Sequence, residues 1–177
     1  MIQTVEEKLN GKLKLIDYIK LKEPFAFIHF RPKTCYNGKV LMLAYLDSRD
    51  VMKRLDDVVG MTGWSCEYKE IKNNLYCGIT IAGVVKWDCG TESKSDAEKG
   101  ESSDAFKRAA VKWGVGRYLY YLPKLQVEIS NSGTKYINIK DKATEQWVKG
   151  YYDLPTLPVW AYPKKKEEKK DKQNENQ

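Results

Sequence analysis

The residues best suited to chemistry in this sequence lie in one stretch, SSDAFKRAAVKWGVGRYLYYLP, residues 102–123. If this stretch is helical, its apolar and basic side chains separate onto opposite sides. The apolar side holds Phe106, Ala109, Ala110 and Trp113, and the basic side holds Lys107, Arg108 and Lys112. No glutamate is interleaved one turn away to pair with the cations. The pattern is typical either of a solvated surface helix or of a surface that holds a polyanion.

Glycines and tyrosines follow the basic residues. Gly114-Val115-Gly116 does not form a dinucleotide-binding loop, because these glycines come after a helix and Leu119 occupies the place of the third glycine. They are expected to loosen the helix end or to allow close packing. The three tyrosines can stack on nucleic-acid bases or pack into the core, and both alternatives stay open for Tyr118, Tyr120 and Tyr121.

Catalytic groups are few. His29 is the single histidine and alternates with apolar neighbours, so we expect a core residue with a satisfied ring and no catalytic triad. The cysteines show no metal-ligand spacing, and we expect reduced, mostly buried thiols at Cys35, Cys66, Cys77 and Cys89. A metal-dependent nuclease is the less favoured alternative, and it would use Asp47, Asp50 and Asp56. The sequence predicts a protein that is not an enzyme and needs no cofactor.

The net charge supports an acidic partner. It is +7 over 177 residues, and the segment 164–177 holds six lysines against four acids, so +5 belongs to residues 1–163. A basic surface favours nucleic acid or an acidic membrane. No apolar run approaches the ~18 residues of a membrane span, and the N-terminus is charged throughout. We expect a cytoplasmic protein with one domain, 1–163, and a disordered charged tail, 164–177.

The first half of the chain alternates helix and strand patterns. Leu9, Leu13, Ile16 and Ile19 predict one stripe of a helix that ends before Pro24. Residues 25–46 predict a hairpin that turns at Asn37-Gly38, with Arg31 and Lys33 near its bend. Residues 47–60 predict a helix that Asp47 or Ser48 caps and Gly60 ends. Its apolar face holds Val51, Met52, Leu55, Val58 and Val59, and its basic residues are Arg49, Lys53 and Arg54.

An antiparallel meander is predicted next, through residues 64–90, with a turn at residues 72–74. Residues 91–104 lack periodicity and predict a loop, after which Ser102 or Ser103 caps the basic helix. A further hairpin is predicted around residues 130–133, and residues 151–163 are too rich in proline for a regular element. The fold class is α+β.

The sequence also resembles a known family. The runs AYLDSRDVMKRLDDVVGMTGW, KGESSDAFKRAAVKWGVGRYLYYLP and LPVWA resemble the Sak-type single-strand annealing proteins of bacteriophages, in the superfamily of the eukaryotic Rad52 recombination protein and the bacterial DdrA proteins. The resemblance spans roughly residues 24 to 162. It implies a β-β-β-α core, in which a curved antiparallel sheet packs on a long basic helix, with flanking helices and a C-terminal hairpin.

The resemblance also implies residue roles. Lys107 and Arg108 match a pair that contacts the DNA backbone, Lys99 matches a groove lysine, and Ser103 matches a nearby hydroxyl residue. We add Lys112 and Arg117 from their charge and placement. Two positions depart from the eukaryotic pattern: Val111 replaces an arginine, and Arg49 matches another arginine only after a one-residue shift.

The implied activity is ATP-independent binding of single-stranded DNA, around a ring or curved homo-oligomer, and annealing of complementary strands. The alternative is a protein that protects single-stranded ends or loads a recombinase without annealing. Possible further partners are a host single-strand-binding protein, a recombinase and a phage exonuclease, and no membrane is involved.

Overall fold

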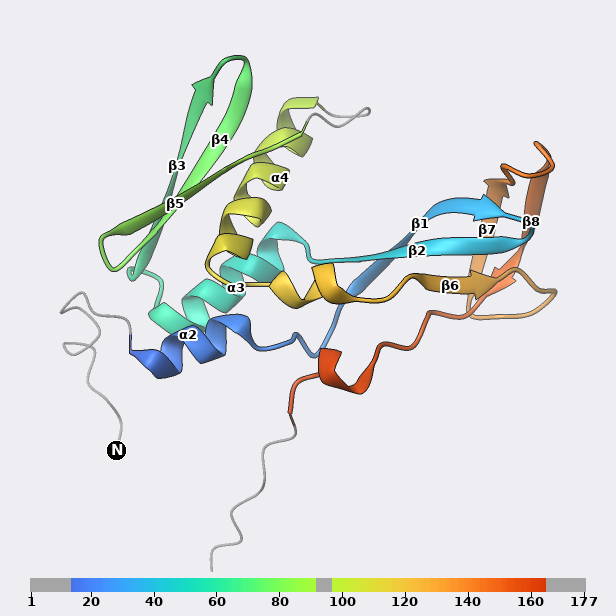
Figure 1. Cartoon of the computed structure of the whole chain (residues 1–177), viewed down its shortest axis with the longest axis horizontal. Helices are drawn as coiled ribbons and strands as arrows, with labels where there is room; N and C mark the ends of the chain where they lie inside the picture. The colour runs from blue at the N-terminus through green and yellow to red at the C-terminus, as the bar shows by residue number, and fades with distance from the viewer. Residues whose placement is uncertain (1–13, 92–96, 165–177) are drawn as a thin grey trace, which may run out of the picture.

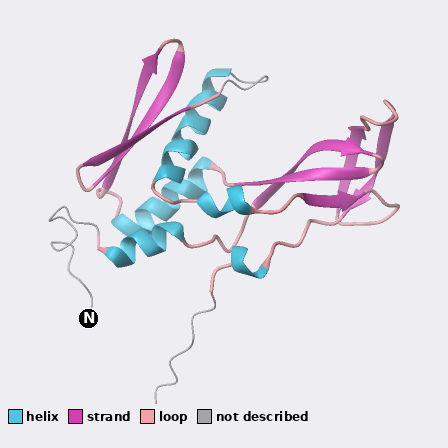
Figure 2. Cartoon of the chain, viewed as in Figure 1, coloured by secondary structure: helices cyan, strands magenta, loops and turns pink. Residues whose placement is uncertain are grey.

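The computed structural model describes residues 14–91 and 97–164, apart from the side chains of residues 97–99. The elements run α2 (Leu15–Lys22), β1 (His29–Tyr36), β2 (Lys39–Tyr45), α3 (Ser48–Val59), β3 (Trp64–Ile71), β4 (Asn74–Ile81), β5 (Val84–Cys89), α4 (Ala97–Lys112), η1 (Arg117–Tyr121), β6 (Leu125–Glu128), β7 (Lys135–Lys140), β8 (Trp147–Tyr152) and η2 (Val159–Ala161). This is the α+β class that the sequence predicts (Figure 2).

The elements form two halves, each with its own apolar core (Figure 1). In the first half, the open antiparallel sheet β3-β4-β5 packs on α4, and α2 and α3 lie beside it. In the second half, the sheet β1-β2-β6 packs against the hairpin β7-β8. The β-β-β-α core is therefore confirmed as the first half.

Several local predictions are confirmed. The turn between β1 and β2 falls at Asn37-Gly38, where both residues have positive φ, as a tight hairpin turn requires. Helix α3 begins after Asp47, whose side chain accepts a hydrogen bond from the Arg49 backbone. Its buried face consists of Val51, Leu55 and Val58, whereas Met52, which was expected there, is 37% exposed.

The first predicted helix has a different buried face. Leu9 and Leu13 lie outside the described residues, and Ile16 and Ile19 are 48% and 49% exposed. The fully buried residue of α2 is Leu21, which joins the core beside α3. The expected stripe is wrong at Ile16 and Ile19, because α2 buries only its C-terminal end.

The start of α4 was also misplaced. The helix begins at Ala97, so Ser102 and Ser103 lie inside it and Asp104 is not in its first turn. The polar residues before Ser102 are helical because they pack on the sheet: the Glu101 carboxylate accepts a hydrogen bond from the Leu75 backbone at 3.0 Å. Tertiary contact here overrides weak helical patterning.

The last hairpin joins other strands than predicted. β6 pairs with β2, and β7 pairs with β8, so residues 130–133 connect two different sheets. β8 includes Tyr151 and Tyr152, which were expected in an irregular segment. Gly150 permits β8 to extend through Tyr151 and Tyr152. Ser130 forms an antiparallel bridge with Tyr151, and a Cβ at position 150 would lie only 2.7 Å from the Ser130 carbonyl oxygen.

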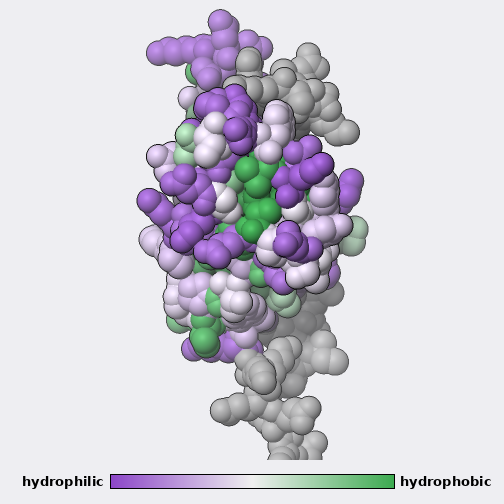
Figure 3. All heavy atoms as spheres, turned by 90° about the vertical axis from the view of Figure 1, so that its right-hand side faces the viewer, coloured by the Kyte–Doolittle hydropathy of each residue, from purple (hydrophilic) through white to green (hydrophobic). Residues whose placement is uncertain are grey.

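The far end of the second half, where β7 and β8 lie, is mainly hydrophilic. Figure 3 shows a narrow hydrophobic strip there between hydrophilic side chains. In the described part of the chain, no helix has the length and apolar character needed to cross a membrane.

Asp141 joins β7-β8 to the first hairpin. This buried carboxylate accepts hydrogen bonds from the backbone of Asn37 at 3.1 Å, Gly38 at 2.7 Å and Ala143 at 2.8 Å, and from the Cys35 thiol at 3.4 Å. These donors hold the pKa of Asp141 at about 2, below its ordinary value of 3.8. The ionised carboxylate therefore fixes the β1-β2 turn.

We expect Asp141→Asn to lower the urea midpoint at pH 7, because an amide cannot accept as many backbone hydrogen bonds. The stabilisation from the charge is complete above about pH 4 and is lost as the pH falls through about 2, since the folded pKa is the lower one. Urea melts from pH 2 to 7 check this. The exposed control Asp57→Asn should leave the midpoint nearly unchanged, and equal midpoints for both variants would contradict the role of Asp141.

Candidate nucleic-acid interface

Helix α4 is fixed on the sheet by its apolar side. Ala105, Phe106, Ala109, Ala110 and Trp113 are all buried, which confirms the predicted apolar side. The Trp113 indole also donates a hydrogen bond to the Ile79 carbonyl of β4 at 2.9 Å. Small alanines allow the helix to approach the strands closely, and the indole fixes its rotation. The basic side therefore lies outside this buried contact, where Arg108 and Lys112 still reach Asp88 and Trp87 of β5.

That side lines a cleft of about 500 Å³ between α4 and the end of the β1-β2 hairpin. Lys107 and Arg108 come from α4, and Arg31 enters from β1. The remaining lining is mixed, with Leu43, Ala44, Tyr45, Leu46, Val51, Asp104, Val111, Val115, Gly116, Leu119 and Tyr120. The cleft thus brings Arg31 beside Lys107 and Arg108, which are more than 70 residues away in the sequence.

Arg31 lies in this cleft because of its position in the strand. It pairs with Leu43, six residues from the Asn37-Gly38 turn, so its predicted place near the bend was wrong. Its guanidinium lies over the Tyr45 ring, with its carbon 5.9 Å from the ring centroid. Lys33 is exposed on the same strand, at the β-bulge between Pro32 and Thr34, and does not line the cleft.

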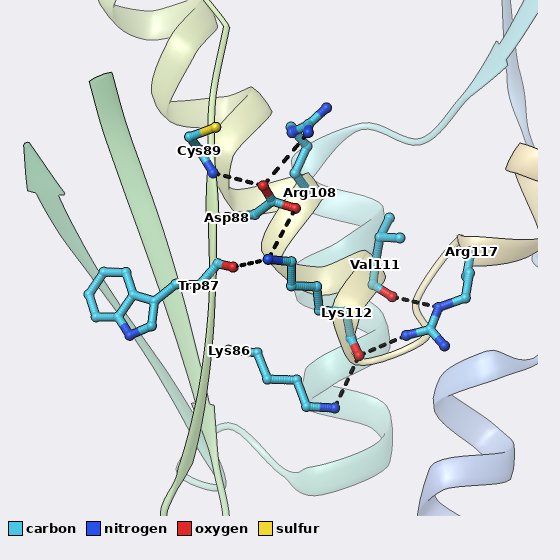
Figure 4. Close-up of polar contacts among 8 residues, drawn as sticks. All are labelled: Lys86, Trp87, Asp88, Cys89, Arg108, Val111, Lys112 and Arg117. Atoms are coloured by element: carbon cyan, nitrogen blue, oxygen red, sulfur yellow. Dashed lines mark hydrogen bonds and ion pairs between the residues drawn. The ribbon is translucent and has the colours of Figure 1, made fainter. Parts of the chain in front are cut away.

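Arg108 has unused hydrogen-bonding capacity. Its nearest carboxylate oxygen is on Asp88 of β5, 3.7 Å from Nη2, which is longer than a good charge-assisted hydrogen bond (Figure 4). Its Nε is buried and has no partner among the described residues. Lys107 makes no hydrogen bond or ion pair within that same part of the chain. Both side chains can therefore take an anionic oxygen without giving up a strong contact.

Lys112 and Arg117 have structural partners at the end of α4 (Figure 4). Lys112 donates to the Trp87 carbonyl and lies 3.7 Å from Asp88. Arg117 donates from Nε to the Val111 carbonyl at 2.9 Å and from Nη2 to the Lys112 carbonyl at 2.8 Å. Cations at a helix C-terminus satisfy its last carbonyl groups and complement its dipole.

Lys86 completes this group of cations. Its ammonium donates to the Lys112 carbonyl at 3.1 Å and lies 4.1 Å from the centroid of the Trp113 ring. Burial, followed by the charges of Arg117 and Lys22, lowers the pKa of Lys86. The end of α4 is thus a cluster of positive charges.

The glycines after α4 allow the chain to leave the helix, as the sequence predicts. Gly114 and Gly116 have φ values of 100° and 68°, which favour glycine. A Cβ at Gly116 would lie 2.7 Å from Cδ1 of Leu46. These residues therefore permit both the turn and the close packing that forms the cleft.

Two residues implied by the family resemblance lie elsewhere on α4. The Ser103 hydroxyl forms a 2.6 Å hydrogen bond with the Ser48 hydroxyl at the start of α3. It therefore ties the two helices together. Lys99 lies in α4, but its side chain is outside the described residues.

The basic residues of α3 do not line the cleft. Arg49 is exposed, and Lys53 pairs with Asp57 at 2.7 Å. Arg54 donates to the carbonyls of Lys20 and Glu23 and lies 4.0 Å from the centroid of the Phe25 ring. Arg54 therefore joins α3 to the segment after α2.

The tyrosines differ in their surroundings. Tyr118 is half-buried, and its hydroxyl accepts a hydrogen bond from the Phe25 backbone at 3.0 Å. Tyr120 lines the cleft and is 67% exposed, and Tyr121 is 72% exposed. Tyr118 is thus a packing residue, and Tyr120 is the one placed to contact a ligand in the cleft.

The acids of the nuclease alternative have structural partners. Asp47 and Asp50 form a capping box at the start of α3, and Asp50 also lies 3.1 Å from His29 Nε2. Asp56 accepts a hydrogen bond from the Trp64 indole at 2.8 Å. His29 is satisfied as expected, but its side chain is 34% exposed and is not in the core. Within residues 14–91 and 97–164, no group of metal-ligating side chains is found.

The cysteines are free thiols. Cys35 and Cys77 are buried, Cys89 is half-buried and Cys66 is exposed. Burial, with the neighbouring Cys66, raises the pKa of Cys77 to about 12, which makes that thiol a poor nucleophile.

Sequence patterns missed three residues that shape the site. Asp88 lies between Arg108 and Lys112, Tyr45 lies beneath Arg31, and Asp104 lines the cleft and accepts hydrogen bonds from Thr91. No sequence pattern pointed to Asp88 or Tyr45 as site residues, because the residues that they contact are distant in the sequence. Asp104 was visible beside the basic residues, but it was assigned to the helix start.

Comparison with known proteins agrees with this arrangement. The model of the Rad52/22 family of double-strand break repair proteins matches residues 18–80 and 76–137, which include both walls of the cleft. The chain belongs to the Rad52/22 family.

Two relatives of this chain come from Deinococcus species. The chain is 34% identical over 163 residues to a protein named single-stranded DNA-binding protein DdrA from Deinococcus radiodurans, covering 85% of this chain and 70% of that protein. It is also 34% identical over 132 residues to the protein of the same name from Deinococcus deserti, covering 71% of this chain and 58% of that protein.

We expect Arg117→Ala to destabilise the fold by about 1 kcal/mol, because two carbonyls at the end of α4 lose a charged donor. For a domain of this size, the melting temperature should fall by about 2–4 °C. Thermal melts followed by circular dichroism check this, with the exposed Lys124→Ala as the control. An unchanged melting temperature would show that Arg117 does not support the helix end.

Proposed function

We propose that this protein binds single-stranded DNA and anneals complementary strands without ATP, in phage or bacterial recombination and repair. One observation carries the proposal: Lys107, Arg108 and Arg31 line one cleft, and none of them is strongly paired there. The names of the two Deinococcus relatives agree with single-stranded DNA as the ligand.

The cations suit phosphate in particular. The Arg108 side chain is 40% exposed and its contact with Asp88 is long, at 3.7 Å, so a phosphate oxygen can accept a stronger hydrogen bond from its guanidinium. Contacts of this kind carry no sequence information, so binding should tolerate any sequence and weaken strongly with salt. A strand held by its phosphates keeps its bases available for pairing.

Tyr120 and Tyr45 add apolar ring surface to the cleft. Such rings can stack on bases, which strengthens binding to single strands over duplexes, since duplex bases are already stacked. The chemistry needs no nucleotide cofactor, because strand pairing is itself favourable. Annealing then depends only on holding the two strands together.

A homo-oligomer is part of the proposal. Among residues 14–91 and 97–164, strand β3 pairs only with β4, and its residues from Ser65 to Ile71 are exposed. Tyr68 and Ile71 are 44% and 47% exposed on this edge. A long exposed edge strand favours association with another chain, and a ring or curved multimer would extend the cleft into a continuous DNA path.

A second candidate function is binding without annealing, as in end protection or recombinase loading. The names of the two Deinococcus relatives refer to binding of single-stranded DNA, which this candidate function shares with the first. Further partners stay predictions: a host single-strand-binding protein, a recombinase or an exonuclease, in the bacterial cytoplasm. The charged tail predicted at residues 164–177 lies, from residue 165, outside the described residues.

We expect Lys107→Ala/Arg108→Ala to weaken binding of a labelled single-stranded oligonucleotide by about a hundredfold or more, because two phosphate contacts are lost. The slope of log affinity against log salt should fall by about 0.7 for each charge removed. Fluorescence anisotropy at several salt concentrations measures both quantities.

The matched control is Lys20→Ala/Lys39→Ala, which removes the same charge from exposed positions outside the cleft. Its affinity should change only slightly. Equal losses in both double variants would mean that net charge alone drives binding, and a lower melting temperature of the cleft variant would assign a structural role to the pair.

We expect the wild-type protein to accelerate annealing of complementary labelled oligonucleotides with no nucleotide present, because coated strands meet with their bases exposed. Energy transfer between the two labels measures the rate, and native mass spectrometry in the same buffer should show more than one subunit. Tight binding with pairing no faster than in buffer would favour the second candidate function.

A further inference from the structure

The outer face of the β7-β8 hairpin carries exposed rings and cations outside the cleft. Its cross-strand pairs are Tyr136 with Tyr151, Asn138 with Lys149, and Lys140 with Trp147. All six residues are exposed, and the rings of Trp147, Tyr136 and Tyr151 are 68%, 59% and 41% exposed. Cross-strand partners point to the same side, so these six side chains share one surface, called here the hairpin face.

The opposite side of the hairpin holds it in place. Ile137 and Tyr152 are 5% and 8% exposed and belong to the core of the second half, and Ile139 packs against them. Asp141 ties the end of β7 to the Asn37-Gly38 turn. The hairpin therefore keeps its fold without burying the three outer rings. Core packing does not account for the presence of three aromatic residues on this exposed face.

The geometry suits stacking at two points. The rings of Tyr136 and Tyr151 lie 5.5 Å apart, edge to face, at one end of the hairpin face. Trp147 is four residues from Tyr151 along β8, which places it ~13 Å away at the other end. Lys149 lies between them and makes no ion pair within the described residues. Lys140 is beside Trp147 and is paired with Glu145.

We propose that the hairpin face is a base-stacking surface for the single-stranded DNA that the protein holds, an inference that rests on the proposed function. Aromatic rings displayed from strands stack on unpaired bases, and Lys149 between the rings meets a phosphate. The cleft, by contrast, has three cations and contacts mainly the backbone. Most of the hairpin face, from Asn138 onward, lies beyond the residues that the family model matches.

Charge complementarity favours DNA over a protein partner at this face. Lysine is depleted in the cores of protein interfaces, whereas here Lys149 and Lys140 lie among the rings. Figure 3 shows that this end of the molecule is mainly hydrophilic, with only a narrow hydrophobic strip. A polyanion with exposed bases matches both the cations and the rings.

The test compares two oligonucleotides of equal length, one of thymidines and one built only of abasic residues. Trp147→Ala/Tyr151→Ala should bind the thymidine strand about tenfold or more weakly than wild type and the abasic strand equally well. Trp160→Ala, which removes an exposed tryptophan outside the hairpin, should change neither affinity. Native mass and melting temperature are measured on each variant.

Photo-crosslinking of the wild-type protein to iodouridine-substituted single strands gives a readout without mutation. Crosslinks should map by mass spectrometry to peptides that contain Tyr136, Trp147 or Tyr151. If wild type binds neither oligonucleotide, the proposed function fails. A second outcome is that the wild type binds thymidine strands, the double variant binds them equally well, and no crosslink maps to the hairpin. In that case the stacking surface is wrong and the proposed function stands. A reduced subunit number with unchanged DNA affinity would instead assign the hairpin face to contacts between copies of the chain.

Discussion

The structure depends on how closely α4 lies on β4 and β5. Alanines at positions 105, 109 and 110 leave room for the strands, and the Trp113 indole fixes the rotation of the helix through the Ile79 carbonyl. Because an α-helix is rigid, this apolar contact alone decides where Lys107 and Arg108 point. The direction of these two cations is thus set by residues that are buried beneath the helix.

The cations divide into two classes by their partners. Those at the end of α4, Lys86, Lys112 and Arg117, donate to backbone carbonyls and stabilise the helix terminus. Those in the cleft, Arg31, Lys107 and Arg108, keep donors available. Charge alone does not separate these classes in the sequence, because each class holds both lysine and arginine. The distinction comes from the proximity of carbonyl groups.

The sequence was sufficient where local signals and tertiary packing agree. Helix α3 has a cap, an apolar face and a terminal glycine, and the first hairpin has an Asn-Gly turn, so both were predicted closely. It was insufficient where distant contacts decide. The start of α4 depends on the sheet, the pairing of β8 depends on Gly150 beside Ser130, and the place of Arg31 depends on strand register. Helical periodicity placed Lys107 and Arg108 on the basic side of α4, but no local pattern pointed to Asp88 or Tyr45.

Phe25 and Leu119 pack against both apolar cores, so they join the two halves of the molecule. The cleft has one wall in each half, α4 in the first and β1-β2 in the second. Its width is therefore governed by a joint of few side chains, and each wall keeps its own internal packing. A substitution at Phe25 or Leu119 would therefore act on the spacing of the two walls and leave the internal packing of each half in place.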